Sequence, residues 1–260
     1  MGPRRTTRPI FVDQQADTDR LVWNQNCSHN LTVYLRQKLN DTEGRIGIVV
    51  KPCDSKTINV LGAENRIDRD RLHIIGIECE GILEGNVKQN ADSGELQRRC
   101  LACDLTEPLD MDYMIGGSIE RKNLPDNSTS NKLSRWLEKA TADDRLEYWL
   151  SEFDRCIRCY ACRQACPLCD CPTCLFERED SIWTGSSATT KDNRSFHLGR
   201  AFHLAGRCIG CGECQRACPM DINLGELNRV LAREMEEQFH HRAGYTVELS
   251  PITTILGEGR

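Results

Sequence analysis

Two copies of one cysteine pattern constrain this chain more than any other feature. Each copy reads C-x2-C-x2-C-x3-C-P, and the copies span Cys156–Pro167 and Cys208–Pro219. Three closely spaced thiolates in such a run reach one 4Fe-4S cluster, and the fourth, which precedes a proline, ligates a neighbouring cluster. The ligand sets should therefore cross. We assign one cluster to the first set, Cys156, Cys159, Cys162 and Cys218, and another to the second set, Cys208, Cys211, Cys214 and Cys166.

Structural zinc and disulfides are the alternatives for these two runs. Zinc also favours C-x2-C pairs, but it needs two separated pairs around one tetrahedral ion, whereas the triple spacing, the proline and the duplication favour iron. Disulfide frameworks belong to short secreted chains. This chain has 260 residues, and no apolar signal segment follows its N-terminal arginines. The runs therefore predict an electron carrier.

The composition limits the classes to which the chain can belong. Sixteen cysteines in one chain are typical of metal ligation by reduced thiols. A net charge of −5 argues against nucleic acid as a ligand, because phosphate contacts need a clustered basic face. No apolar run approaches the length of about 20 residues that spans a bilayer, so we expect no direct membrane insertion. We predict a cytoplasmic protein.

The first half of the chain alternates between strand and helix patterns. The expected order is strand 20–23, helix 31–39, strand 46–50, helix around 58–61 and strand 72–77. The strands 46–50 and 72–77 are continuously apolar, as expected for a parallel sheet that is covered on both faces. We therefore predict an α/β part, with a small parallel sheet and flanking helices, followed by a helix-rich two-cluster ferredoxin-like domain.

Five further cysteines lie in this half of the chain. Cys27, Cys53 and Cys79 are spaced 26 residues apart, each just past an expected strand, and Cys100 and Cys103 follow. Loops after parallel strands share one edge of a sheet, so these thiols can converge. We predict a third cluster on a third set, Cys53, Cys79, Cys100 and Cys103, with Cys27 as a spare thiol or an extra ligand. Buried thiols that pack as small hydrophobes, or a zinc site, are the alternatives.

Three segments around the third set carry a resemblance to a known family. These are Val50-Lys-Pro-Cys53-Asp-Ser-Lys, Ile75-Gly-Ile-Glu-Cys79-Glu-Gly and Cys100-Leu-Ala-Cys103-Asp-Leu-Thr-Glu-Pro. They resemble the beta-subunit family of deazaflavin-coenzyme-dependent hydrogenases and formate dehydrogenases over roughly residues 20 to 120. The resemblance implies an iron-sulfur flavoprotein that passes electrons between the coenzyme and larger subunits, with the third set as cluster ligands. The sequence itself assigns no residue to a flavin, because no early glycine-rich segment is present and Gly116-Gly117 is more typical of a turn.

The first run is followed by three more thiols, Cys169, Cys171 and Cys174. A two-cluster module does not need them. They predict either a fourth iron-sulfur centre, a zinc site with an outside ligand, or hydrogen-bond support for the first cluster. Four arginines that flank the runs are expected to offset cluster charge: Arg158, Arg163, Arg207 and Arg216.

The rest of the chain divides at changes in composition. Residues 123–131 are rich in Asn, Asp, Ser and Pro, which indicates a loop. Apolar spacing predicts two helices between 132 and 153, one over 196–205, and an amphipathic docking helix over 224–239, before an extended tail over 245–255 that could lie along another subunit. We divide the chain into an α/β domain (1–125), a linker with helices (126–155), a dicluster domain (156–224), and a docking helix with its tail (225–260).

These patterns together predict an iron-sulfur electron-transfer subunit of a cytoplasmic multi-subunit oxidoreductase. The expected partners are the redox subunits of a hydrogenase, a formate or aldehyde dehydrogenase, or a heterodisulfide-reductase-like complex. Such a relay need not bind a substrate. The alternative is a subunit that contains flavin and itself exchanges hydride with a nicotinamide or deazaflavin coenzyme. A scaffold that holds zinc in its N-terminal half is a second alternative.

Overall fold

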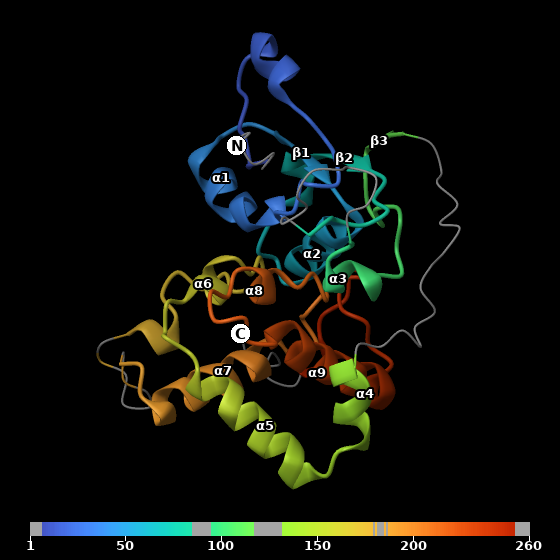
Figure 1. Ribbon diagram of the computed structural model, residues 1–260. Helices are drawn as coiled ribbons and strands as arrows, with labels where there is room; N and C mark the ends of the chain where they lie inside the picture. Colours follow the sequence, from blue (N-terminus) through green and yellow to red (C-terminus); the bar gives the residue numbers. More distant parts are fainter. Residues whose placement is uncertain are drawn as a thin grey trace, which may run out of the picture.

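The computed structural model describes residues 7–84, 95–116, 132–178, 180, 185 and 187–252. The α/β part lies at one end of the molecule, and the longer C-terminal helices lie at the other (Figure 1). Two short helices of the cysteine runs, α6 (Ala161–Gln164) and α8 (Glu213–Arg216), lie between these ends. The cysteine runs are therefore in the middle of the molecule. No helix in the described part of the chain is long and apolar enough to cross a membrane.

The sheet of the α/β part is parallel and has the strand order β1-β2-β3. Strand β1 (Ile46–Val50) pairs with β2 (Leu72–Ile77) along its whole length, and β2 pairs with the short β3 (Tyr113–Ile115). The first two strands confirm the sequence prediction, whereas β3 was not predicted. The predicted strand at 20–23 is wrong. Arg20 ends a 3-10 helix over Gln15–Arg20, and Leu21 and Val22 are exposed and pair with no strand.

Helix α2 (Pro52–Ala63) is the central helix of the molecule, and α1 (Leu35–Asp41) packs near it. Pro52 starts α2, where its missing N–H costs no hydrogen bond. The helix is buried even at its polar positions, because other segments cover them. Ser55 Oγ accepts a hydrogen bond from Leu109 N at 2.9 Å, and Asn59 Nδ2 donates to Gly244 O at 2.9 Å.

One hydrophobic core joins the α/β part to the dicluster part. It contains apolar residues of the sheet and α2 together with Leu168, Leu204 and Ile209, and cysteines of the second set pack against it. The Arg207 guanidinium crosses the same boundary and pairs with Glu64, with 2.6 Å between Nη2 and Oε2. The two halves are therefore held in a fixed relation by burial and by a partly buried ion pair.

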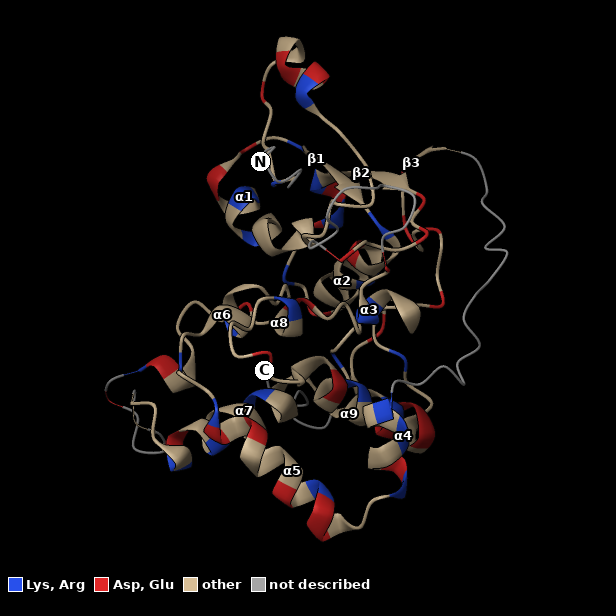
Figure 2. Ribbon diagram, in the orientation of Figure 1, with Lys and Arg blue, Asp and Glu red and all other residues tan. Residues whose placement is uncertain are grey.

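The longer C-terminal helices are α4 (Lys132–Lys139), α5 (Ala142–Asp154), α7 (Thr190–Leu204) and α9 (Leu224–Phe239). They confirm the predicted pair of helices before the first run, the helix between the runs and the helix after them, although α7 begins six residues earlier than predicted. The side chain of Thr141 caps α5 by accepting from Asp144 N at 3.1 Å. Figure 2 shows acidic residues along the ribbon of α5 and charged residues of both signs on α9. The predicted linker 123–131 lies outside the described residues.

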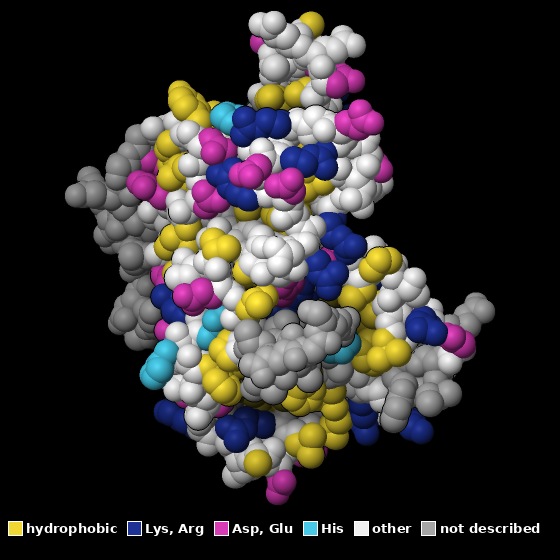
Figure 3. Space-filling model, turned by 180° about the vertical axis from the view of Figure 1, so that it is seen from behind, with side chains coloured by type: hydrophobic (Ala, Val, Ile, Leu, Met, Phe, Trp, Pro, Cys, Tyr) yellow, Lys and Arg dark blue, Asp and Glu magenta, His cyan; other side chains and the backbone are white. Residues whose placement is uncertain are grey.

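The described part of the tail begins with a turn on the chain's own surface, and its apolar residues Val247, Leu249 and Ile252 are exposed. Contact of this segment with another subunit stays a prediction. Residues 242–245 form a turn, and Gly244 accepts the hydrogen bond from α2 described above. The Tyr245 hydroxyl donates to Asp104, and Ser250 is buried. Residues 244–245 therefore pack on the chain's own α/β part, and Ser250 lies beside Gly206 of the dicluster part. Residues 253–255 of the predicted extended segment lie outside the described residues. From behind, hydrophobic side chains lie in small groups among charged ones over both halves (Figure 3).

Candidate iron-sulfur centres

The two cysteine runs fold into the same turn. Residues two and four positions after the first cysteine have left-handed backbone conformations in both runs: Arg158 and Tyr160 in the first, Gly210 and Gly212 in the second. This turn directs a backbone amide back at the first sulfur. Arg158 N lies 3.3 Å from Cys156 Sγ, and the Gly210 amide bonds to the Cys208 sulfur in the same way. Amides that point at thiolates suit a cluster, since they stabilise sulfur-centred negative charge.

The first set lines one cavity. All four of its cysteines, Cys156, Cys159, Cys162 and Cys218, lie in the wall, with aromatic and apolar residues completing it. Cys156 and Cys162 both interact electrostatically with Cys218, although 62 and 56 residues, respectively, separate them from it in sequence. Burial raises the pKa of Cys162 to about 12, so an empty site would hold that thiol protonated. The structure thus brings the fourth cysteine of the second run to the first three of the first run.

In the second set, the fourth cysteine of the first run lies with the first three cysteines of the second run. Cys166 interacts with Cys208, Cys211 and Cys214; Cys214 is buried and the other three are half-buried. Burial raises the pKa of Cys208 to about 12 and raises those of Cys211 and Cys214 as well. The two sets are neighbours, because Cys162 of the first also interacts with Cys214 of the second.

The third set also consists of neighbouring thiols. Cys53 interacts with Cys79, and Cys79 interacts with both Cys100 and Cys103. Amides again point at sulfur, since Ile82 N lies 3.2 Å from Cys100 Sγ. Burial raises the pKa of Cys79 to about 11. Cys53 and Cys79 follow β1 and β2, so the convergence arises at the carboxyl edge of the parallel sheet.

Lys51 places a buried positive charge beside the third set. Lys51 is 4% exposed, and its ammonium group lies 2.8 Å from an Asp54 carboxylate oxygen and interacts with the sulfurs of Cys53 and Cys79. Burial alone would lower the pKa of Lys51, but these negative neighbours outweigh it and raise that pKa. A permanent cation at this position can offset the charge of a thiolate-ligated cluster.

The extra cysteines are not gathered at one point. Cys169 bonds to the Cys166 sulfur of the second set, Cys174 packs against the apolar residues of the first, and Cys171 is exposed. Cys27 has local contacts, with its sulfur 3.7 Å from Val22 O. Within the described ranges, no three Cys, His, Asp or Glu residues are placed to hold a single metal ion. The fourth centre, the zinc alternatives and the ligand role of Cys27 therefore stay predictions.

Sequence reasoning missed two of the buried cations beside the sulfurs. Of the four arginines singled out from the sequence, Arg158 interacts with the Cys156 sulfur, whereas Arg207 and Arg216 pair with Glu64 and Glu213. The two that were missed are Arg99, which donates to Cys211 O at 3.0 Å, and Arg200, which donates to Cys162 O at 3.1 Å; both also interact with cysteine sulfurs. The sequence did indicate that Arg200 is buried, because Arg200 follows Phe196 by four residues and precedes Leu204 by four. This spacing places it on the apolar face of its helix.

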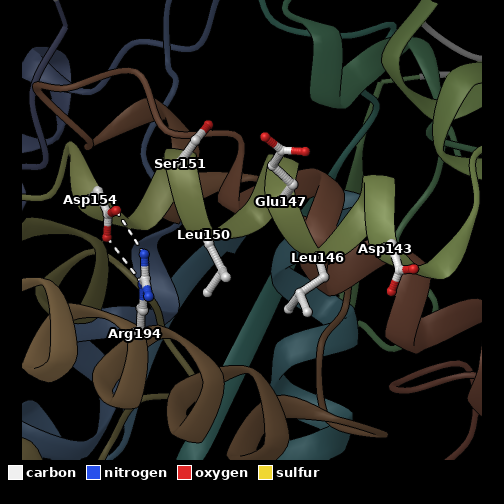
Figure 4. A pocket seen from close by; sticks show the side chains of 7 residues that line it. All are labelled: Asp143, Leu146, Glu147, Leu150, Ser151, Asp154 and Arg194. Carbon is white, nitrogen blue, oxygen red and sulfur yellow. Dashed lines mark hydrogen bonds and ion pairs between the residues drawn. The ribbon is translucent and has the colours of Figure 1, made fainter.

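A shallow hollow elsewhere on the surface contains no thiol. It runs along α5, where Leu146 and Leu150 point toward α7 and Asp154 pairs with Arg194, with 2.8 Å between Oδ2 and Nη2 (Figure 4). The cysteine sets therefore remain the candidate centres.

Comparison with known proteins agrees with this geometry. Residues 155–223 match the family model of 4Fe-4S dicluster domains. The beta subunit of F420-dependent formate dehydrogenase from Methanocaldococcus jannaschii is 24% identical and aligns over 95% of this chain and 86% of its own length. The beta subunit of F420-dependent formate dehydrogenase 1 from Methanococcus maripaludis is 31% identical over 94% of this chain and 84% of its own length. The chain belongs to the beta-subunit family of F420-dependent formate dehydrogenases.

Membership in this beta-subunit family confirms the resemblance seen in the sequence. The chain is an iron-sulfur electron-transfer subunit of a multi-subunit oxidoreductase, and its C-terminal half contains a 4Fe-4S dicluster domain. Its partners are other redox subunits.

Proposed function

We propose that this chain is the electron-relay subunit of an F420-dependent formate dehydrogenase complex and holds three 4Fe-4S clusters, on the first, second and third sets. Such clusters, when bound, supply one-electron acceptors and donors. The observation that carries the proposal is the cavity shared by Cys156, Cys159, Cys162 and Cys218, which supports crossed ligand sets.

The proposed relay has the second set in the middle. Cys162 and Cys214 connect the first set to the second. Arg99 connects the second to the third, because its guanidinium bonds to Cys211 O and also interacts with the sulfurs of Cys53 and Cys100. At the outer end, Cys159 is exposed, and its neighbour Ile157 is 54% exposed. We propose that a partner subunit exchanges electrons at this exposed end.

Iron, sulfide, zinc and flavin analysis of anaerobically purified protein tests the proposal, together with electron paramagnetic resonance of the reduced form. Three cubanes correspond to about 12 iron atoms per chain, and two to about 8. The proposal expects about 12, with no zinc. About 8 iron atoms with stoichiometric zinc would overturn the third cluster, and stoichiometric flavin would favour the subunit that exchanges hydride itself. The cytoplasmic location stays a prediction.

A further inference from the structure

Arg200 carries a positive charge into the interior of the dicluster part. It stands on α7 and is 5% exposed. One guanidinium nitrogen, Nη2, donates to Cys162 O at 3.1 Å, whereas Nε is buried without a hydrogen-bond partner among the described residues. No carboxylate in the described part of the chain forms an ion pair with Arg200. A buried cation without a counter-charge is costly, so its compensation must come from something else.

The groups around this guanidinium are the thiols of both sets. Arg200 interacts with Cys162 of the first set and with Cys166 and Cys214 of the second, and also with the extra thiol of Cys169. Burial raises the pKa of Cys162 and of Cys214, and the charge of Arg200 acts against that rise in each case. One cation therefore faces two neighbouring cluster sites.

Two other buried arginines have more partners within the protein than Arg200 has. Arg99 pairs with the Glu213 carboxylate and also donates to Ser28 O at 2.7 Å. Arg158 donates to the carbonyl oxygens of Asp192, Phe176 and Gly185 at 2.7 to 3.2 Å. Arg200 differs from Arg99 because no described carboxylate pairs with it. It differs from Arg158 because it donates to one described carbonyl oxygen rather than three, although Nε of Arg158 is also buried without a hydrogen-bond partner there. The sulfurs of both sets therefore make up most of the polar surroundings of Arg200.

We propose that Arg200 is a counter-cation shared by the first and second cluster sites, and that its charge raises the reduction potentials of both. Reduction adds a negative charge to a cluster, and a nearby fixed cation stabilises that charge. The inference rests on the proposed function, because it requires clusters on both of these sets. It goes further by assigning one side chain to two redox centres.

The test is a potentiometric titration of the reduced paramagnetic signals in anaerobically purified full-length protein. The variants are Arg200→Met and Arg200→Gln, which remove the charge, and Arg200→Lys, which keeps it. Arg194→Met on the same helix is the matched control, because its guanidinium is partly exposed and pairs with Asp154. At a fixed applied potential, we expect both neutral variants to lower the reduced-to-oxidised ratio of the first and second clusters about tenfold. This equals a fall of about 59 mV in each reduction potential for a one-electron step. The Lys variant and the control should stay near wild type.

Each outcome either supports or overturns the role proposed for Arg200. If only one signal shifts, or neither, Arg200 is not a shared counter-cation. If the neutral variants lose iron while Arg200→Lys retains it, the charge itself is needed to hold the clusters, which supports the inference. If Arg200→Lys also loses iron, the guanidinium acts through its shape, and the inference is overturned. A wild-type protein with fewer than about 8 iron atoms per chain would instead contradict the proposed function.

Discussion

The two cysteine runs share a spacing and a backbone but have opposite surroundings. In the first run the left-handed positions are Arg158 and Tyr160, whose side chains bond to the insert between the runs. In the second run both positions are glycine, and the Arg99 side chain of the α/β part occupies the space beside Gly212. The cysteine spacing thus sets the turn that holds sulfur. The residues between the cysteines decide which part of the protein lies against each site.

Gly212→Tyr is expected to have the largest effect, because it gives the second run the side chain of the first. A Cβ atom at this position would already lie 2.7 Å from Cβ of Arg99. We expect the Arg99 segment to be displaced, with loss of about 4 iron atoms from the third set and a fall in the melting temperature of roughly 8 °C. Iron analysis and thermal unfolding measure both effects.

The reciprocal change, Tyr160→Gly, is the control for this prediction. It removes the bond from the Tyr160 hydroxyl to Phe176 O but introduces no clash, so the iron content should remain near that of the wild type. If Gly212→Tyr keeps the iron content of the wild type, a glycine at this position is not required for Arg99 to pack beside the second run.

Arg158→Met is expected to have an intermediate effect, confined to the insert. The change leaves three buried or part-buried carbonyl oxygens without their charged donor. Hydrogen bonds to charged groups contribute about 1.5–3 kcal/mol each, so limited proteolysis between α6 and α7 should become at least about tenfold faster. Arg178→Met is the matched control, since Arg178 is exposed and pairs only with exposed Asp180 among the described residues. Equal cleavage rates in the two variants would contradict the role given to Arg158.

His197→Phe is expected to have the smallest effect. It should change the first cluster site and leave the second unchanged. His197 lines the first cavity, and neither ring nitrogen has a partner among the described residues. Burial lowers its pKa to about 3, so the neutral ring has one N–H to donate toward the cluster sulfurs. Loss of this donor should lower the reduced-to-oxidised ratio of the first-set signal by about threefold and leave the second unchanged. The exposed His203, changed to Phe, is the control; an equal shift in it, or a shift of both signals, would exclude this role.

Local patterns predicted much of the architecture. The strand Ile46–Val50 and the helix Leu224–Phe239 were predicted with their observed bounds, because apolar periodicity is a local property. The strand predicted at 20–23 failed because a short apolar stretch becomes a strand only where a partner lies beside it, and Leu21 and Val22 have none. Strand β3 was missed for the opposite reason, since its three residues form a strand only through pairing with β2.

The cluster sites could be predicted where the spacing of the cysteines determines them. Cysteine spacing alone led to the three sets that the structure brings together. The polar groups around them could not be predicted in the same way, because the burial of Arg99, Lys51 and His197 depends on segments that are distant in sequence. That packing places Arg99 beside Cys53, Lys51 beside Cys79, and His197 in the cavity of the first set. Such groups are found by asking where each buried charge has its partner.

The crossed ligand sets are the central claim, and spectroscopy of four single variants tests them most directly. Cys159 and Cys211 each lie within one run and mark the first and second cluster, respectively. In reduced, anaerobically purified protein, Cys166→Ser should reproduce the paramagnetic changes of Cys211→Ser, and Cys218→Ser should reproduce those of Cys159→Ser. If Cys166→Ser instead reproduces Cys159→Ser, each run holds its own cluster and the account is contradicted.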